Sequence, residues 1–214
     1  MRQEPQTVYI VDDDAAVRDS LALLLELKGF RARAFDSAES FLEALDPAWS
    51  GCVVMDLRMP GMDGIRLQEE LVRRGVPLPA VIVTAHGDIA TARKTLKTGA
   101  VDFIEKPVDD EQLLTAVRAA LDLEAERRTQ LKQAEELAIR LERLTGRERE
   151  VLDMVVAGRH NREVAAALGI SPRTVEVYKA RMMEKLQVRR LPDLIRLVMS
   201  ARDGSDAPAQ GGST

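Results

Sequence analysis

The chain has 214 residues, a net charge of −4 and a hydrophobic fraction of 45%, of which little is aromatic. This length allows one large or two small domains with aliphatic cores. A single cysteine, Cys52, excludes an intrachain disulfide framework and favours a reducing compartment. No signal peptide opens the chain, and its longest apolar cluster, 21–27, is too short to cross a bilayer. We therefore expect a soluble cytoplasmic protein with no membrane partner.

The charge is distributed unevenly along the chain. Residues 1–121 hold 14 Lys and Arg against 20 Asp and Glu, whereas residues 145–202 hold 12 against 7. The first part is therefore acidic by −6 and the later part basic by +5. Such asymmetry indicates that the C-terminal part contacts a polyanion.

Residues 1–121 alternate between the two kinds of secondary-structure pattern. Short apolar runs predict strands, and apolar side chains at helical spacing predict the segments between them as helices. This alternation predicts an α/β domain whose parallel sheet is covered on both faces. The predicted strands are 7–11, 31–35, 52–56, 80–84 and 101–104, and the predicted helices are 15–27, 37–45, 65–74, 88–97 and one that begins at Asp109.

Three of these strands end in charged residues. Asp12 and Asp13 follow the first strand, Asp56 ends the third, and Lys106 follows the fifth. The carboxyl ends of parallel strands share one edge, so these side chains should converge there. Neighbouring carboxylates repel by roughly 4 kcal/mol per pair at an effective dielectric near 20. A hard divalent cation, Mg²⁺, would relieve this repulsion, although an acid at a strand end can also be a simple helix cap or turn former.

The residues Asp12-Asp13, Asp56, Thr84 and Lys106-Pro107, with the run Asp56-Leu-Arg-Met-Pro-Gly-Met-Asp-Gly64, resemble the motifs of a bacterial response-regulator receiver domain. The resemblance covers roughly residues 7–121 and implies a flavodoxin-like (βα)5 doubly wound fold. It implies that a sensor histidine kinase phosphorylates Asp56 and that Lys106 pairs with a phosphate oxygen. It further implies a switch made by Thr84 and Phe103, which would otherwise be a turn residue and a core residue. The implied Mg²⁺ ligands are Asp12, Asp13, Asp56 and the backbone carbonyl of Arg58.

A long uninterrupted helix is expected to follow, because residues 110–144 contain neither glycine nor proline. We assign residues 122–144 to a helical linker between two domains. The spacing of Ala134, Leu137, Leu141 and Leu144 fits a short coiled-coil seam between two chains, or equally a plain linker. The charged residues expected to form its solvated face are Glu124, Arg127, Arg128, Glu135, Glu136, Arg140 and Glu142.

Residues 145–202 predict a small all-helical domain. Thr145 and Glu148 form a capping box for a helix to about residue 157. Asn161 is expected to cap a helix over 162–168, and Ser171 a third helix from Pro172 to about Gln187. A fourth helix is predicted over 192–200, and residues 203–214 should be a disordered tail.

The second and third of these helices form a helix-turn-helix candidate. The third carries Arg173, Lys179, Arg181 and Lys185, which could also be ordinary solvated surface, and Val175, Met182 and Leu186 would face the core. The strings Leu144-Thr-Gly-Arg-Glu-Arg-Glu-Val-Leu152, Asn161-Arg-Glu-Val-Ala165 and Ser171-Pro-Arg-Thr-Val-Glu-Val-Tyr178 resemble the LuxR/FixJ-type DNA-binding domain.

This resemblance implies that the third helix enters the major groove of double-stranded DNA. Helical spacing places Glu176, Val177 and Ala180 on one face, where they could meet base edges. The side chains expected to hold phosphates are Arg173, Thr174, Lys179 and Arg181.

Together these features predict a non-enzymatic regulator that binds promoter DNA under the control of phosphorylation. Homodimerisation on phosphorylation and contact with RNA polymerase are further expectations. Three alternatives compete: an aspartate-based phosphatase, a receiver whose C-terminal helices bind RNA or protein, and a phosphate sink. Arg58 stands where such phosphatases carry a second acid, and the helix-turn-helix argues against a phosphate sink.

Overall fold

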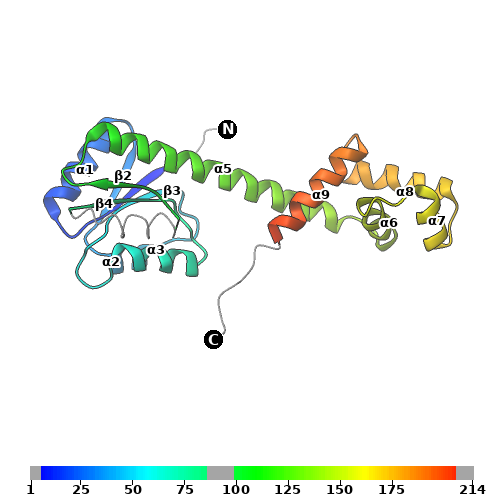
Figure 1. Ribbon diagram of the computed structural model, residues 1–214, viewed down its shortest axis with the longest axis horizontal. Coiled ribbons are helices and arrows are strands. Elements are labelled where there is room, and N and C mark those ends of the chain that lie inside the picture. Colours follow the sequence, from blue (N-terminus) through cyan, green and yellow to red (C-terminus); the bar gives the residue numbers. More distant parts are fainter. Residues whose placement is uncertain (1–5, 86–98, 206–214) are drawn as a thin grey trace. The chain divides into compact units, whose positions relative to one another are not determined.

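The computed structural model describes residues 6–85 and 99–205, which fall into two compact units divided between Arg128 and Thr129 (Figure 1). The helix predicted at 88–97 and the end of the predicted tail lie outside the described residues. In the part that is described, no helix combines the length and the apolarity needed to cross a membrane.

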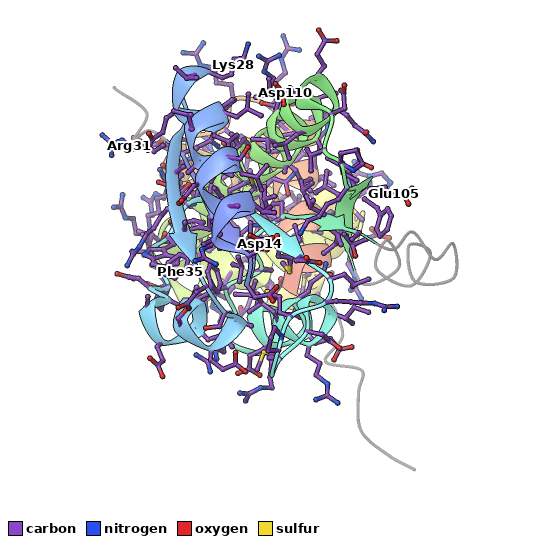
Figure 2. All side chains as sticks on the ribbon, turned by 90° about the vertical axis from the view of Figure 1, so that its left-hand side faces the viewer. Asp14, Lys28, Arg31, Phe35, Glu105 and Asp110 are labelled. Atoms are coloured by element: carbon purple, nitrogen blue, oxygen red, sulfur yellow. The ribbon has the colours of Figure 1, made fainter. Side chains whose placement is uncertain are left out.

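The first unit is built on a five-stranded parallel sheet, as the alternating pattern predicted. Its strands are β1 (Thr7–Val11), β2 (Arg31–Phe35), β3 (Gly51–Asp56), β4 (Ala80–Thr84) and β5 (Ala100–Glu105). The strand order β2-β1-β3-β4-β5 is that of a flavodoxin-like doubly wound sheet, with its topological switch point between β1 and β3. Phe35 and Glu105, which end the two outer strands, lie on opposite sides of Asp14 in Figure 2.

Side chains alternate across this sheet into two apolar layers. Tyr9, Val53 and Ile82 join the layer covered by α2 (Ala38–Ala44) and α3 (Gly64–Arg73). Val8, Val54 and Val81 join the layer covered by α1 (Ala15–Leu27) and α5 (Asp110–Glu142). Figure 1 shows these two pairs of helices on opposite faces of the sheet. Burial on both faces explains why the strands read as nearly continuous apolar runs.

Among the described residues, the second unit has four further helices after the end of α5. They are α6 (Gly146–Val156), α7 (Asn161–Leu168), α8 (Pro172–Lys185) and α9 (Leu191–Ser205). Val175, Met182 and Leu186 are fully buried in their shared core, as the sequence predicted. Leu137 and Leu144 are buried in the same core and Leu141 packs against it. The interpretation as a coiled-coil seam is therefore wrong for these leucines, because their partners lie within this chain.

Three helix ends in the second unit differ from the sequence-based expectation. The cap of α7 is His160 rather than Asn161, since the N–H of His160 donates to the Glu163 carboxylate. Helix α8 ends at Lys185, because Gln187 adopts a left-handed conformation with φ of 57°. The last helix also continues past Ser200, into the segment that was expected to be disordered.

The predicted solvated face of the linker contains one buried acid. Glu124 is 0% exposed, and its carboxylate accepts hydrogen bonds from Arg127 and Arg128. Arg128 also donates to the backbone carbonyls of Ala48 and Trp49. These contacts tie the start of the supposed linker to the first unit. Glu124 is therefore a structural residue whose charge is paired internally.

Candidate functional site

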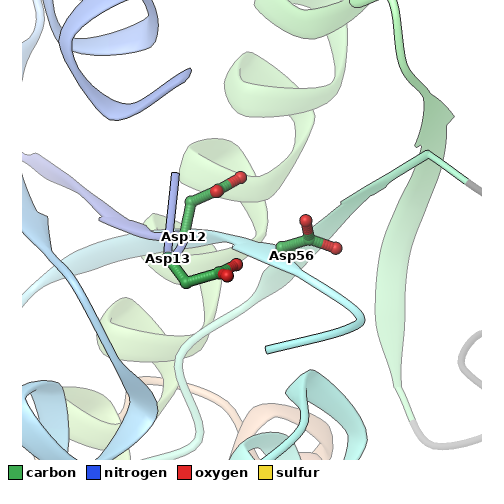
Figure 3. A group of neighbouring side chains, drawn as sticks. All are labelled: Asp12, Asp13 and Asp56. Carbon is green, nitrogen blue, oxygen red and sulfur yellow. The ribbon is translucent and has the colours of Figure 1, made fainter. Parts of the chain in front are cut away.

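Three carboxylates meet at the carboxyl edge of the sheet, as predicted (Figure 3). One oxygen each of Asp12, Asp13 and Asp56 lies within 4.8 Å of the others. Asp12 and Asp56 are buried, whereas Asp13 is exposed. In the part of the chain that the structure describes, this is the sole cluster of three or more His, Cys, Asp or Glu side chains arranged to hold a metal.

Strand pairing brings these acids together. Val11 pairs with Met55 across β1 and β3, so the residues that follow them, Asp12 and Asp56, emerge side by side. The N–H of Arg58 donates to Asp56 at 3.0 Å, and that of Asp14 donates to Asp12 at 2.9 Å. These bonds orient both carboxylates from their own loops.

A glycine allows the next helix to begin close to the phosphoacceptor candidate. A Cβ atom at Gly64 would lie 2.5 Å from the carbonyl oxygen of Asp56, closer than real Cβ contacts allow. The N–H of Gly64 donates to the carbonyl of Leu57 and closes the loop. The Asp63-Gly64 pair at the end of the motif is therefore explained by close backbone approach.

Lys106 bridges two of the acids. Its Nζ lies 2.7 Å from Oδ2 of Asp12 and 2.7 Å from Oδ2 of Asp56. Its N–H donates to the carbonyl of Thr84, which fixes the loop after β5 to the end of β4. Burial disfavours the charged ammonium, but the hydrogen bonds and charges of Asp12 and Asp56 outweigh this and raise the pKa of Lys106 above its usual value.

The charges at this edge do not balance, since one ammonium faces three carboxylates. The donor set consists of hard carboxylate oxygens, which suits Mg²⁺ better than a softer transition metal. The structure therefore brings Asp12, Asp13, Asp56 and Lys106 to one place. Arg58 lies in the adjoining loop and contacts Asp56 through its N–H.

The two residues of the expected switch lie on neighbouring strands. Thr84 ends β4 and is 1% exposed, while Phe103 in β5 is half-buried and packs against the layer under α2 and α3. Phe103 pairs in register with Ile82, two residues before Thr84. The segment that follows β4 soon passes outside the described residues.

Two residues that support the site were missed by sequence reasoning. A guanidinium nitrogen of Arg18 donates to the carbonyl of Asp12 at 2.7 Å. The carboxylate of Glu39 accepts the N–H of Met62 at 2.9 Å, which anchors the loop after Asp56 to α2. Both contacts depend on the packing of α1 and α2, so no local sequence signal could have identified them.

In the second unit, α8 presents most of the predicted contact residues to solvent. Ser171 caps the helix by accepting the N–H of Thr174, as predicted. Thr174 and Lys179 are half-buried, and Nζ of Lys179 donates to Oδ1 of Asn161 at 3.1 Å. The exposed residues of the predicted set are Arg173, Glu176, Val177, Ala180 and Arg181.

Lys185, by contrast, is held inside the unit. Its Nζ lies 2.6 Å from Oε2 of Glu148, which is buried and also accepts the N–H of Thr145. Desolvation opposes ionisation of Glu148, but the bonds from Lys185 and Thr145 prevail and lower its pKa. Lys185 thus remains partly exposed, but its charge is neutralised by Glu148 within the fold.

Comparisons with known proteins agree with both halves of this description. Residues 8–118 match the family described as "Response regulator receiver domain", and residues 142–198 match "Bacterial regulatory proteins, luxR family". The transcriptional regulatory protein FixJ of Azorhizobium caulinodans is 45% identical over 92% of this chain and 94% of its own length. FixJ of Bradyrhizobium diazoefficiens is 43% identical over 91% of this chain and 95% of its own length.

Solved structures also match this chain over most of its length. The response regulator StyR aligns with a TM-score of 0.79 and 43% identity over 92% of this chain and 100% of its own. Full-length FixJ from B. japonicum aligns with a TM-score of 0.57 and 42% identity over 94% of this chain and 99% of its own. The chain thus belongs to the FixJ/LuxR family of two-component response regulators, which combine a receiver domain with a LuxR-type DNA-binding domain to regulate transcription.

Proposed function

We propose that Asp56 is the residue that accepts the phosphoryl group from a phosphohistidine of a sensor histidine kinase. A carboxylate oxygen of Asp56 forms a bond to phosphorus while the P–N bond breaks, and the bonding electron pair returns to the imidazole nitrogen. The observation that carries this proposal is the convergence of Asp12, Asp13 and Lys106 on Asp56 at the sheet edge. The transfer is stoichiometric, so the protein acts as a regulator and not as an enzyme with turnover.

We assign the binding of Mg²⁺ to Asp12, Asp13, Asp56 and the backbone carbonyl of Arg58. The ion would neutralise charge that develops on the phosphoryl oxygens. Lys106 supplies a second positive charge, since its ammonium already lies 2.7 Å from Asp56 and can pair with a phosphate oxygen. Once Asp56 is esterified, Lys106 exchanges one carboxylate partner for the phosphoryl group.

Phosphorylation adds close to two negative charges beside Thr84. We propose that the Thr84 hydroxyl turns toward the phosphoryl group and that Phe103 moves inward with it. This change reshapes the surface near β5 and α5 and promotes a two-fold homodimer, which suits a palindromic or repeated half-site. Sedimentation with and without a phosphodonor tests the step, and an unchanged monomer mass at concentrations that support DNA binding would contradict it.

Helix α8 is the proposed reader of double-stranded promoter DNA. Glu176, Val177 and Ala180 are exposed on one face and are assigned to base edges. The residues assigned to phosphates are Arg173, Thr174, Lys179 and Arg181. RNA polymerase is proposed as a further partner at the promoter. A gel shift on duplex DNA against RNA of the same sequence separates this assignment from RNA binding.

The proposal for Asp56 is tested with a small-molecule phosphodonor and Mg²⁺. The native chain should gain one acyl phosphate per molecule, and Asp56→Asn should gain none, because its amide is not a nucleophile. Asp63→Asn is a matched control, since Asp63 caps α3 outside the acid cluster. Stoichiometric label on Asp56→Asn would refute the assignment. Catalytic release of phosphate from many substrates would instead favour the phosphatase alternative.

A further inference from the structure

A cavity of about 760 Å³ opens on the second unit between the start of α6 and the later half of α8. Its lining includes Arg147 and Glu150 from α6 and Tyr178, Arg181 and Lys185 from α8. None of the assignments above uses Arg147 or Tyr178. Lys185 is used inside the fold, where it neutralises Glu148, and the Tyr178 ring packs against the core of the unit. The lining thus adds two further cations, Arg147 and Arg181, and the hydroxyl of Tyr178.

The helical spacing of α8 places this cavity beside the face assigned to the bases. Side chains on a helix are separated by about 100° per residue, so Arg181 lies roughly 40° from Val177 and about 100° from buried Met182. The cavity thus lies on the flank between the base-contact face and the core. Lys179 lies on the opposite flank, where it donates to Asn161 of α7.

A helix in the major groove has a phosphate backbone on each side. Lys179 supplies the cation for the phosphate backbone on one flank of α8. On the other flank, Arg181 is exposed and has no ion-pair partner within the described residues. Its guanidinium is therefore available to a phosphate on that side.

The acids of the cavity do not cancel this charge. Glu148 is buried and neutralised by Lys185 at 2.6 Å, so its charge is satisfied inside the unit. Glu150 pairs with Arg147 at 2.9 Å, but both side chains are about half exposed. Exposed ion pairs contribute only about 0–1 kcal/mol, so a phosphate can displace Glu150 from Arg147 with little loss of stability.

We propose that this cavity binds a phosphate of the DNA backbone, with Arg147 and Arg181 as its cationic contacts and the Tyr178 hydroxyl as a hydrogen-bond donor. The inference rests on the proposed DNA-binding role of α8 and adds a second element, α6, to the interface. Phosphate contacts position a protein on the duplex and carry no base preference. The cavity therefore fixes the register of α8 in the groove from the flank opposite Lys179.

The salt dependence of DNA binding tests the proposal. Binding of the full chain to a random-sequence duplex several helical turns long is measured by fluorescence anisotropy over a range of salt concentrations. Each phosphate contact that is lost should reduce the slope of log affinity against log salt by about one unit. Arg147→Gln should show this reduction and weaken all sequences alike, whereas Glu150→Gln should leave the slope intact and strengthen binding by freeing Arg147.

Arg196→Gln is the matched control, because it removes one exposed arginine of the same unit from α9, outside the cavity. An unchanged slope for Arg147→Gln, or an equal reduction for Arg196→Gln, would overturn the proposal while the DNA-binding function stands. If the native chain bound no duplex DNA, the proposed function itself would fail first. Adding inorganic phosphate at constant ionic strength separates the two sources of phosphate. If the cavity binds a duplex phosphate, millimolar inorganic phosphate should not weaken DNA binding by the native chain. If the cavity is a site for free phosphate, inorganic phosphate should weaken DNA binding by the native chain but not by Arg147→Gln.

Discussion

Lys106 and Lys185 both reach buried carboxylates, and the balance of charge around them differs. Lys106 faces Asp12 and Asp56, with Asp13 within reach of both acids. Lys185 faces Glu148 alone, and Thr145 of the capping box donates to the same carboxylate oxygen as Lys185 does. The first site keeps an excess of negative charge that only a further cation can neutralise, whereas the second is complete. An unbalanced cluster therefore indicates a binding site, and a balanced pair indicates a structural bond.

Removing the first lysine should impair chemistry more than folding. In Lys106→Met the phosphoryl oxygens lose a positioned cation, so phosphorylation of Asp56 should slow by about 100-fold, the scale seen when one preorganised donor is removed. Phosphorylation kinetics with a small phosphodonor measure this. A rate within twofold of the native chain would show that Lys106 only neutralises the resting acids.

Removing the second lysine should impair folding and leave phosphorylation intact. Lys185→Met leaves Glu148 buried without its cation, and we expect the free energy of unfolding of the second unit to fall by about 2 kcal/mol. Urea unfolding followed by circular dichroism checks this, with Lys132→Met, at an exposed position of α5, as the control. The comparison breaks down if Lys185→Met is as stable as the control.

A further lysine, Lys179, donates to the neutral side-chain amide of Asn161, so its positive charge is not neutralised and can attract a DNA phosphate. Lys179→Ala should weaken binding to all sequences alike and lower the salt slope by about one unit. Glu176→Ala should instead cost roughly 1–3 kcal/mol on the cognate site and relax preference at one base pair. Anisotropy titrations on cognate and scrambled duplexes distinguish them, and the reverse pattern would mean that the faces of α8 are assigned wrongly.

The balanced pair also predicts an acid sensitivity of the second unit. Because the pKa of Glu148 is lower in the folded unit than in the unfolded chain, its ionisation adds stability above the unfolded pKa. That stability is present above the ordinary glutamate pKa of about 4.3 and is lost as the pH falls from there through the lower pKa of the folded unit. Unfolding of the native chain and of Glu148→Gln should therefore differ at neutral pH and converge in acid. A constant difference across this range would exclude the linkage.

Much of this architecture was predictable from the sequence. The periods of the apolar residues located β1, β2, β4 and α1 with the observed bounds, and the acids at strand ends located the carboxylate cluster. These features are local, because strand and helix periods and strand-end residues are read within short windows. The order of a parallel sheet then brings their ends together.

What the sequence did not predict depends on contacts between distant segments. In the sequence, Glu124 is one acid among several on a charged helix. Its burial depends on Arg128, which donates to Glu124 and also to the backbone carbonyls of Ala48 and Trp49 in the first unit. Lys185 carries the same charge as Lys179 and Arg181 on α8, and its partner Glu148 is far away in the sequence. Leu137, Leu141 and Leu144 have a coiled-coil spacing that is equally satisfied by packing in their own domain.

Magnesium binding to Lys106→Met tests the central claim most directly, because the excess of carboxylates over lysine is what we hold responsible for the cation site. Calorimetric titration should show one Mg²⁺ per native chain and tighter binding in Lys106→Met, since the competing ammonium is gone, although this variant is phosphorylated more slowly. Asp13→Asn should weaken binding by about tenfold or more, equivalent to about 1.4 kcal/mol. Unchanged Mg²⁺ affinity in both variants would contradict the account, because the cation would then bind elsewhere.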